Sequence, residues 1–281
     1  MLQGFIFLGV MLVALNLVSY NSLKLELIII LISISCLRIF AQNNSNLLLN
    51  GSFEAVTNRP NNAGQLSLSE NWTVPNQSTP DLFCTKSDIS TLVKVPQNFM
   101  GNQNSQDSDI YCGLALYHAD TSFKNYREYI QGKLISPLIE NSVYNVSMFI
   151  SWAEISDYFC DRIGYSFSRA LLNPDLEIKK KRKNRIKNNP NEINNIILKS
   201  SGYTILNYDS LIDRDRWHKV EFQYKAKGGE LYFLIGLFGD NINNLTLDSL
   251  RNSNKVNRSS IGKAAYFYLD NLSVTEETFT H

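Results

Sequence analysis

The chain has 281 residues, a formal net charge of only +1, and 19% charged residues. This balance favours neither nucleic acid nor an anionic membrane surface as a partner, because both select strongly basic chains. Aromatic residues reach 11%, with 14 Tyr and 15 Phe, which is typical of β-strands and of surfaces that bind polar ligands.

The first 41 residues are predicted to form a targeting segment. Lys24 precedes the apolar run Leu27–Phe40, and the small residue Ala41 follows, a pattern typical of a secretory signal peptide. We expect cleavage after Ala41 and a protein that is secreted or lies at the outer cell surface. An uncleaved membrane hairpin is one alternative, although its apolar runs fall short of the ~20 residues of a spanning helix. A lipid anchor at Cys36 is another.

The remaining residues, 42–281, are predicted to form a single β-sandwich domain. Three cysteines follow the leader: Cys84, Cys112 and Cys160. In an exported protein this odd number allows one disulfide and one free thiol, and the sequence does not choose the pair. The chain has no Cys-x-x-Cys motif, so a zinc site is not expected.

Most of this domain alternates apolar and polar residues with a period of two, which predicts β-strands. In the stretch 217–226, apolar residues alternate with Lys and Glu, indicating a strand with one wet face. The stretch 228–239 is apolar on both faces, and Gly228-Gly229 before it predicts a hairpin over 217–238. Further strands are expected at 110–117, 126–134, 143–152, 161–168 and 264–274. Trp152 and Trp217 lie on predicted strands and are expected in the core.

Two segments break this pattern. Residues 58–109 are rich in Asn, Gln, Ser and Pro, and we expect an extended loop region with short strands, lying over one face of the sandwich. Residues 173–200 contain IKKKRKNRIKNNPNEINN, which we interpret as a basic, disordered insertion between two strands. Many strands joined by turn-rich connections indicate an all-β sandwich of the jelly-roll class.

The two ends of the domain carry carboxylates in similar surroundings. NLLLNGSFE places Glu54 just after the first apolar stretch, and YFYLDNLSV places Asp270 within the last strand. The terminal strands of a jelly roll commonly run close together, so the two carboxylates are predicted to meet. With oxygens near Asn50 and Ser52 they could bind Ca²⁺, which takes six to eight oxygen ligands. Such a site would be structural.

NGSFE, GGELYFLIG and FYLDNLSV together resemble the galactose-binding-like jelly rolls, in particular carbohydrate-binding modules of families four and nine. The segments TPDLF, NYREYIQGKLISPL and DRIGYSFS resemble more closely a bacterial cell-envelope module of that type. The resemblance implies that Glu54 and Asp270 sit at a structural calcium site. It covers residues 46–275 apart from the basic insertion. In that family a peptidoglycan-binding domain often follows the module, and because this sequence stops at His281 we expect it to depart from that arrangement.

A sugar site needs aromatic faces for the apolar side of a ring and polar groups for its hydroxyls. Trp72, in the polar stretch SENWTVPNQ, is the most promising aromatic platform, with a lid packed on the sandwich as the alternative. Around Arg127, strand alternation predicts Tyr126 and Glu128 on one face and Arg127 and Tyr129 on the other. The candidate ligand-binding residues are Trp72, Tyr117, His118, Tyr126, Arg127 and Tyr158.

These features predict a non-catalytic carbohydrate-binding module whose partner is a polysaccharide or other glycan. A structural or adhesive envelope protein that binds a protein partner or peptidoglycan is the alternative. A glycosidase would need two carboxylates facing one cleft. Glu154, Asp157 and Asp161 cluster in SWAEISDYFCD, but a cluster within one loop more often forms a turn or a solvated rim. No motif of a triad, a zinc protease or a phosphate-binding loop is present, and we expect no enzyme.

Overall fold

The computed structural model describes residues 45–76, 78–118, 126–156, 158, 160, 162–173, 197, 203–207, 216–238 and 264–277. Asn46–Glu277 forms one compact unit. The predicted leader and all of the basic insertion except Asn173 and Ile197 lie outside the described residues. Among the residues described, no helix is both long and apolar enough to cross a membrane.

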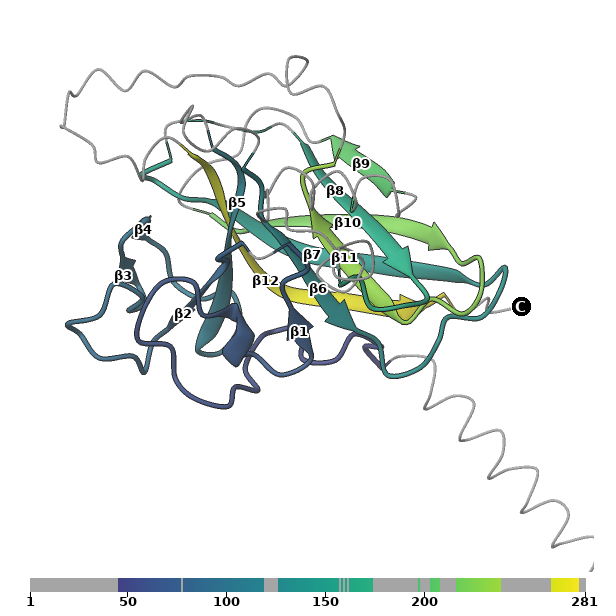
Figure 1. Ribbon diagram of the computed structural model, residues 1–281, viewed down its shortest axis with the longest axis horizontal. Helices are drawn as coiled ribbons and strands as arrows, with labels where there is room; N and C mark the ends of the chain where they lie inside the picture. The colour runs from purple at the N-terminus through teal and green to yellow at the C-terminus, as the bar shows by residue number, and fades with distance from the viewer. Residues whose placement is uncertain are drawn as a thin grey trace, which may run out of the picture. The chain divides into compact units, whose positions relative to one another are not determined.

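The described regular structure is almost entirely β (Figure 1). One sheet contains, in spatial order, β1 (Trp72–Thr73), β6 (Tyr129–Lys133), β11 (Tyr232–Gly236), β8 (Arg162–Ser168) and β9 (Tyr203–Asn207). The other contains β10 (His218–Lys225), β7 (Val143–Trp152), β12 (Ala264–Glu276), β5 (Ile110–His118) and β2 (Asp81–Cys84). The short strands β3 (Gln97–Asn98) and β4 (Gly101–Asn102) pair with each other, and a 3-10 turn, η1, spans Leu66–Leu68.

The predicted all-β jelly-roll sandwich is confirmed. Every pairing between the named strands is antiparallel, and from β5 to β12 the chain passes repeatedly between the two sheets. The predicted hairpin over 217–238 is wrong, because β10 pairs with β7 in one sheet and β11 with β6 and β8 in the other. Gly228 and Gly229, with φ of 84° and 85°, turn the chain from the sheet that holds β10 to the sheet that holds β11.

The main core fills the space between the sheets. It takes alternate residues from β7 and β12, among them Val146, Met148 and Ile150, together with Trp152 as predicted. β11 lies between β6 and β8 and is buried on both faces, also as predicted. On its outer side, Leu234 packs with Tyr129, Phe238 and Ile197.

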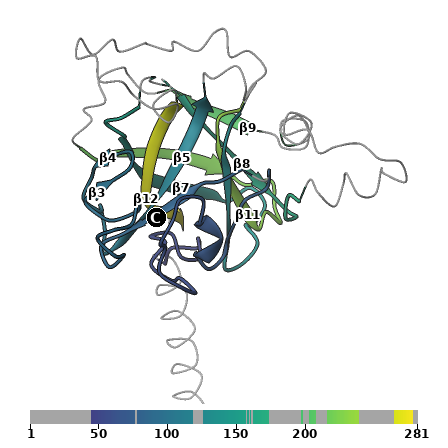
Figure 2. The ribbon, with the colours of Figure 1, turned by 60° about the vertical axis from the view of Figure 1, so that its left-hand side comes forward.

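A second apolar cluster lies on the outer face of the sheet that holds β5 and β12. Residues 85–109, here named the covering segment, run over this face, with β3 and β4 beside β5 and β12 in Figure 2. The segment buries Val93, Val95 and Met100 against aromatic residues of the sheet, which are Phe83, Tyr111, Tyr266 and Tyr268. The expectation that residues 58–109 would lie over one face is therefore confirmed for residues 85–109, whereas β1 and β2, which precede them, are strands of the two main sheets.

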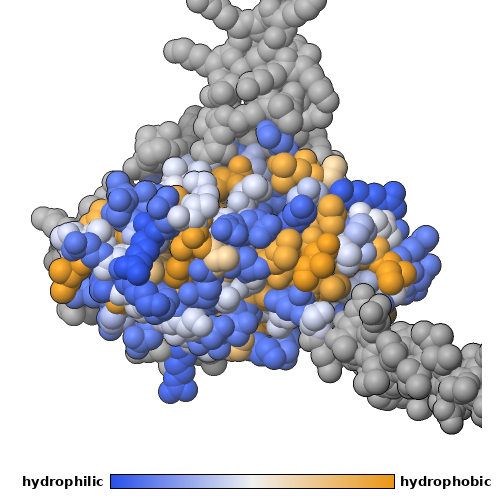
Figure 3. Space-filling model, turned by 90° about the horizontal axis from the view of Figure 1, so that it is seen from below, coloured by the Kyte–Doolittle hydropathy of each residue, from blue (hydrophilic) through white to orange (hydrophobic). Residues whose placement is uncertain are grey.

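The cysteines are buried and unbridged. None of Cys84, Cys112 and Cys160 forms a disulfide, so the bridge that their number allows is absent. Cys84 and Cys112 belong to the core between the sheets, where they pack as small apolar side chains. On the face of the molecule in Figure 3, apolar groups form several small patches separated by polar side chains.

Candidate functional site

The two ends of the domain are joined by a clasp of hydrogen bonds between residues 46–51 and 272–274. Leu47 N–H donates to Val274 O over 2.8 Å, and Leu272 N–H donates to Gly51 O over 2.9 Å. A side chain at position 51 would collide with the Leu272 carbonyl, so glycine is required for this close approach. The predicted meeting of the terminal segments is confirmed.

Asn46, which the sequence did not single out, contributes most side-chain bonds to this clasp. Its Nδ2 donates to Leu272 O over 2.8 Å, and its Oδ1 accepts from Leu48 N (3.0 Å) and Val274 N (2.9 Å). The side-chain amide of Asn46 thus takes the place of a backbone N–H and C=O where the first segment begins to pair with residues 272–274. Its position just before an apolar run was the only signal in the sequence.

Glu54 and Asp270 both hold the end of the covering segment. Glu54 Oε1 accepts from the backbone N–H groups of Asp109 (2.8 Å) and Ile110 (2.7 Å). Asp270 Oδ2 accepts from those of Gln106 and Asp107, each over 3.0 Å. Burial raises the pKa of both carboxyl groups, that of Asp270 to about 7, because these backbone bonds only partly offset the loss of water.

Several oxygen atoms in this region could contribute to a cation site. Asp270 is fully buried, and Gln106 Oε1 is buried without a hydrogen-bond partner. Glu54 Oε2 makes no hydrogen bond to the described residues, and Ser52 is half-buried nearby in sequence. No group of three or more His, Cys, Asp or Glu side chains gathers within the described part of the chain. A cation here would therefore need amide, hydroxyl or backbone oxygens beside the two carboxylates.

Two of the predicted ligand-binding residues are core residues. Trp72 is 3% exposed, packs on Phe53 with ring centroids 4.7 Å apart, and donates from Nε1 to Asn50 O over 2.8 Å. Arg127 is 4% exposed and donates from Nη1 to Leu237 O over 2.9 Å. Neither side chain offers a face to a ligand, so both predictions are wrong. The polar residues around Trp72 lie in the turns on either side of β1, whereas the ring of Trp72 enters the core.

The other predicted aromatic residues remain half-exposed at the end of β5. Tyr117 lies edge-on to Tyr158, with centroids 6.4 Å apart, and both pack against the core between the sheets. His118 lies edge-on to Tyr126 at 6.3 Å, and Tyr126 packs against the outer-face cluster. The structure therefore divides these residues between two places. The predicted placement of Tyr126 and Glu128 on one face is confirmed, since the Tyr126 hydroxyl donates to Glu128 Oε1 over 2.7 Å.

Of Glu154, Asp157 and Asp161, the carboxylates considered as a catalytic group, only Glu154 is among the described residues. Glu154 Oε2 accepts from Asn102 N over 2.8 Å and so anchors β4 of the covering segment. Gly101 has no room for a side chain beside this carboxylate. Asp157 and Asp161 lie outside the described residues.

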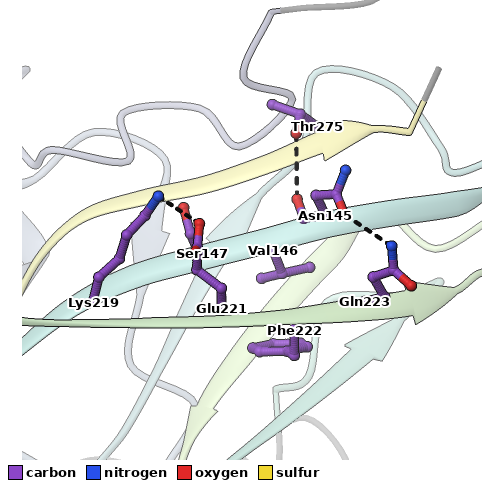
Figure 4. Close-up of a pocket in the computed structure, with 8 residues that line it drawn as sticks. All are labelled: Asn145, Val146, Ser147, Lys219, Glu221, Phe222, Gln223 and Thr275. Carbon is purple, nitrogen blue, oxygen red and sulfur yellow. Dashed lines mark hydrogen bonds and ion pairs between the residues drawn. The ribbon is translucent and has the colours of Figure 1, made fainter. Parts of the chain in front are cut away.

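A polar groove of about 480 Å³ lies on the outer face of β7, β10 and β12 (Figure 4). Gln223 Nε2 donates to Asn145 Oδ1 (3.4 Å) and to Glu277 Oε1 (2.9 Å). Lys219 and Glu221 form an ion pair at the other end of the row. The groove is lined by Asn145, Val146, Ser147, Lys219, Glu221, Phe222, Gln223 and Thr275.

Two aromatic side chains share this outer face outside the groove lining. Buried residues alternate with less buried ones along most of β7, which places Phe149 on the outer face. Phe149 is half-buried and pairs with Lys219 of β10. Trp217, just before β10, packs edge-on against Tyr111 at 5.7 Å and donates from Nε1 to Asn104 O over 2.9 Å. Its predicted place in the core is confirmed only in part, because the side chain is half-buried and packs against the outer-face cluster. The sequence predicted the solvent-exposed face of β10 but not that β7 would be its neighbour in the sheet.

Solved structures with a similar arrangement were found by structure comparison. The chain is similar to carbohydrate-binding modules. One is a Family 16 Carbohydrate Binding Module-2, with 12% identity, a TM-score of 0.35, and coverage of 82% of this chain and 100% of that one. Another is the CBM22-1 xylan-binding domain of Paenibacillus barcinonensis Xyn10C, with 11% identity, a TM-score of 0.39, and coverage of 83% and 96%.

The K2 cleaved adhesin domain of Lys-gingipain is also similar, at 9% identity and a TM-score of 0.40, with coverage of 82% of this chain and 99% of that one. No protein-family model and no curated protein matches the sequence. Similarities this distant do not assign a function to this chain.

Proposed function

We propose that this chain is a non-catalytic carbohydrate-binding module that holds a glycan on the outer face of β7, β10 and β12. The observation that carries the proposal is the polar groove, where amides, a hydroxyl and an ion pair lie side by side on an open sheet face. Amide and hydroxyl groups can exchange hydrogen bonds with sugar hydroxyls. Phe149 and Trp217, on the same outer face, offer apolar rings of the kind on which sugar rings pack.

The sequence supports the same function through NGSFE and YFYLDNLSV, which resemble the terminal motifs of carbohydrate-binding modules. The predicted leader at residues 1–41 supports a site of action outside the cell, at the cell surface or in a secreted form. Polysaccharides are the partners that such a location would present.

A glycan array followed by titration calorimetry on the purified protein tests the proposal. Asn145→Ala and Gln223→Ala each remove an amide from the groove, and we expect each to weaken binding about fivefold to tenfold, since a hydrogen bond contributes about 1 kcal/mol. Asn58→Ala is the matched control, because Asn58 is exposed in a distant loop. Trp217→Ala should weaken binding further, while Trp217→Phe should retain part of it.

Two results would contradict this assignment in different ways. Absence of binding across neutral and acidic glycans would reject the carbohydrate-binding function. Binding that survives the groove variants but is lost in Tyr117→Ala and Tyr158→Ala would keep the function and move the site to the end of β5.

We also propose that Ca²⁺ fastens the terminal clasp. Glu54, Asp270 and Gln106 would supply side-chain oxygens, with the Ser52 hydroxyl as a further candidate, and the cation would neutralise carboxylates that are costly to bury. The support is Gln106, whose backbone N–H donates to the buried Asp270 carboxylate and whose Oε1 is buried without a hydrogen-bond partner. Added Ca²⁺ should raise the unfolding midpoint, and Asp270→Asn should abolish that rise, whereas Asp88→Asn, on an exposed loop, should not. Identical midpoints in Ca²⁺ and in chelator would reject the site.

A further inference from the structure

Two buried carboxylates outside the groove and the clasp lie on the outer face of the sheet formed by β2, β5 and β12. Asp81, at the start of β2, is 4% exposed, and Glu128, just before β6, is 3% exposed. Both belong to sequence segments, TPDLF and NYREY, that neither the groove nor the clasp uses.

Asp81 is reached from β12 by a tyrosine that crosses the intervening strand. The Tyr266 hydroxyl donates to Asp81 Oδ2, although β5 lies between β12 and β2. The crossing is possible because Gly113 of β5 has no side chain, and a methyl group there would overlap the Tyr266 hydroxyl and the Phe83 ring. Asp81 Oδ1 accepts from Gly64 N over 2.5 Å. One carboxyl group thus connects a loop, β2 and β12.

Glu128 makes a corresponding set of bonds one step along the same face. Its Oε2 accepts from Ala115 N of β5 over 2.8 Å. Its Oε1 accepts from the Tyr126 hydroxyl over 2.7 Å and from Thr79 N over 3.1 Å. Thr79 is two residues before Asp81, so both carboxyl groups hold the same end of β2.

No cationic side chain of the described residues forms an ion pair with either carboxyl group. Burial raises the pKa of both, and the charge on Asp81 raises that of Glu128 further. A tyrosine hydroxyl can donate to a carboxylate or accept from a carboxylic acid. The oxygens that face Tyr266 and Tyr126 can therefore carry a proton without losing their hydrogen bonds.

We propose that Asp81 and Glu128 form a proton-dependent latch that fixes β2, and the covering segment that follows it, to β5 and β12. The latch is closed while at least one of the two carboxyl groups is protonated. When both groups ionise, two like charges are buried together without a counter-ion, and the edge strand β2 is released from the sheet. The latch depends on neither glycan nor Ca²⁺.

The groups that act on the pair come from every element packed against it. Tyr266 and Tyr268 lie on β12 and Cys112 lies on β5, and the charge of Asp81 contributes to the raised pKa of each of these groups. Tyr126 acts on Glu128, with His118 edge-on to its ring. The pKa values of the three tyrosines and of Cys112 are raised by burial, so these groups stay neutral while the two carboxyl groups titrate.

Hydrogen exchange of the full chain, read peptide by peptide and corrected for intrinsic rates, tests the latch between about pH 5 and pH 8. We expect the protection of residues 79–84 to fall at least tenfold over this range, because each unit of raised pKa corresponds to a factor of ten. In Glu128→Gln and Asp81→Asn, which keep the size of the side chain without its charge, the fall should largely disappear. Glu140→Gln, at an exposed position before β7, is the control and should behave as the original protein does.

Protection of residues 79–84 that does not change with pH would overturn the proposal, and so would an unchanged fall in Glu128→Gln. Should either variant fail to fold, a carboxyl ¹³C titration of the original protein decides the question directly. Titration of both groups near their ordinary pKa values would refute the latch. The readout is local to β2, so titration of Asp270 and Glu54, which hold residues 106–110, appears in other peptides.

Discussion

Asn46→Ala should destabilise the domain by opening the terminal clasp from its first residue. The substitution removes the Nδ2 donor to Leu272 O and the Oδ1 acceptor shared by Leu48 N and Val274 N. Each bond is partly buried, so water can replace only some of what is lost. The backbone bonds Leu47 N to Val274 O and Leu272 N to Gly51 O remain, but they lose the amide that aligns the two segments.

The expected cost is about 2–3 kcal/mol, since three hydrogen bonds each contribute about 1 kcal/mol and partial solvation returns some of it. In a domain of this size 1 kcal/mol shifts the unfolding midpoint by about 2–4 °C. The midpoint should therefore fall by roughly 4–12 °C. Asn46→Asp should keep the two bonds to Oδ1, lose the bond to Leu272 O, and place a carboxylate oxygen against that carbonyl.

Thermal and urea unfolding of the two variants measure these costs, with Asn58→Ala as an exposed control that should shift the midpoint by less than about 1 °C. Hydrogen exchange at residues 46–51 and 272–274 shows whether the loss is local to the clasp. If Asn46→Ala unfolds at the same midpoint as the control, the side-chain amide does not hold the clasp and the reasoning fails.

Two further predictions concern the core and the buried carboxyl groups. Trp72→Phe should keep the packing on Phe53 but lose the bond from Nε1 to Asn50 O, at a cost of about 1 kcal/mol in urea unfolding; glycan affinity should not change, and a specific loss of affinity in the folded variant would restore Trp72 as a binding residue. In chelator, stability should be greatest at about pH 4 and fall as the pH rises to about 7, because Asp81, Glu128 and Asp270 bind protons in the folded state at pH values where the unfolded chain has released them. Stability that instead rises steadily from pH 4 to pH 7 in the same titration would show that these groups are not held protonated.

The fold class could be predicted from the sequence because burial on one face of a strand leaves a period of two in the chain. That period located β7 at Val143–Trp152, and it located β5, β8 and β12 to within a few residues. The covering segment was predicted as part of the longer region 58–109, because a polar stretch with few apolar anchors has too little apolar surface to form a core of its own. The meeting of NLLLNGSFE with YFYLDNLSV followed from the proximity of terminal strands in a jelly roll.

The partners of each strand were decided only by the tertiary structure. Gly228-Gly229 has the same turn chemistry whether it closes a hairpin or carries the chain to the opposite sheet, so the sequence could not distinguish these outcomes. The direction of a side chain within a loop is also not encoded locally, and Trp72 turned into the core although its neighbours are polar.

The groove and the latch arise between segments that are distant in the chain. Asn145, Gln223 and Thr275 become neighbours because β7 lies between β10 and β12. Tyr266 reaches Asp81 because a glycine occupies the strand between them. The sequence alone determined which residues face water or the core along each strand, since that depends on local alternation. The tertiary structure alone determined which of them meet, since that depends on how the strands are ordered in the two sheets.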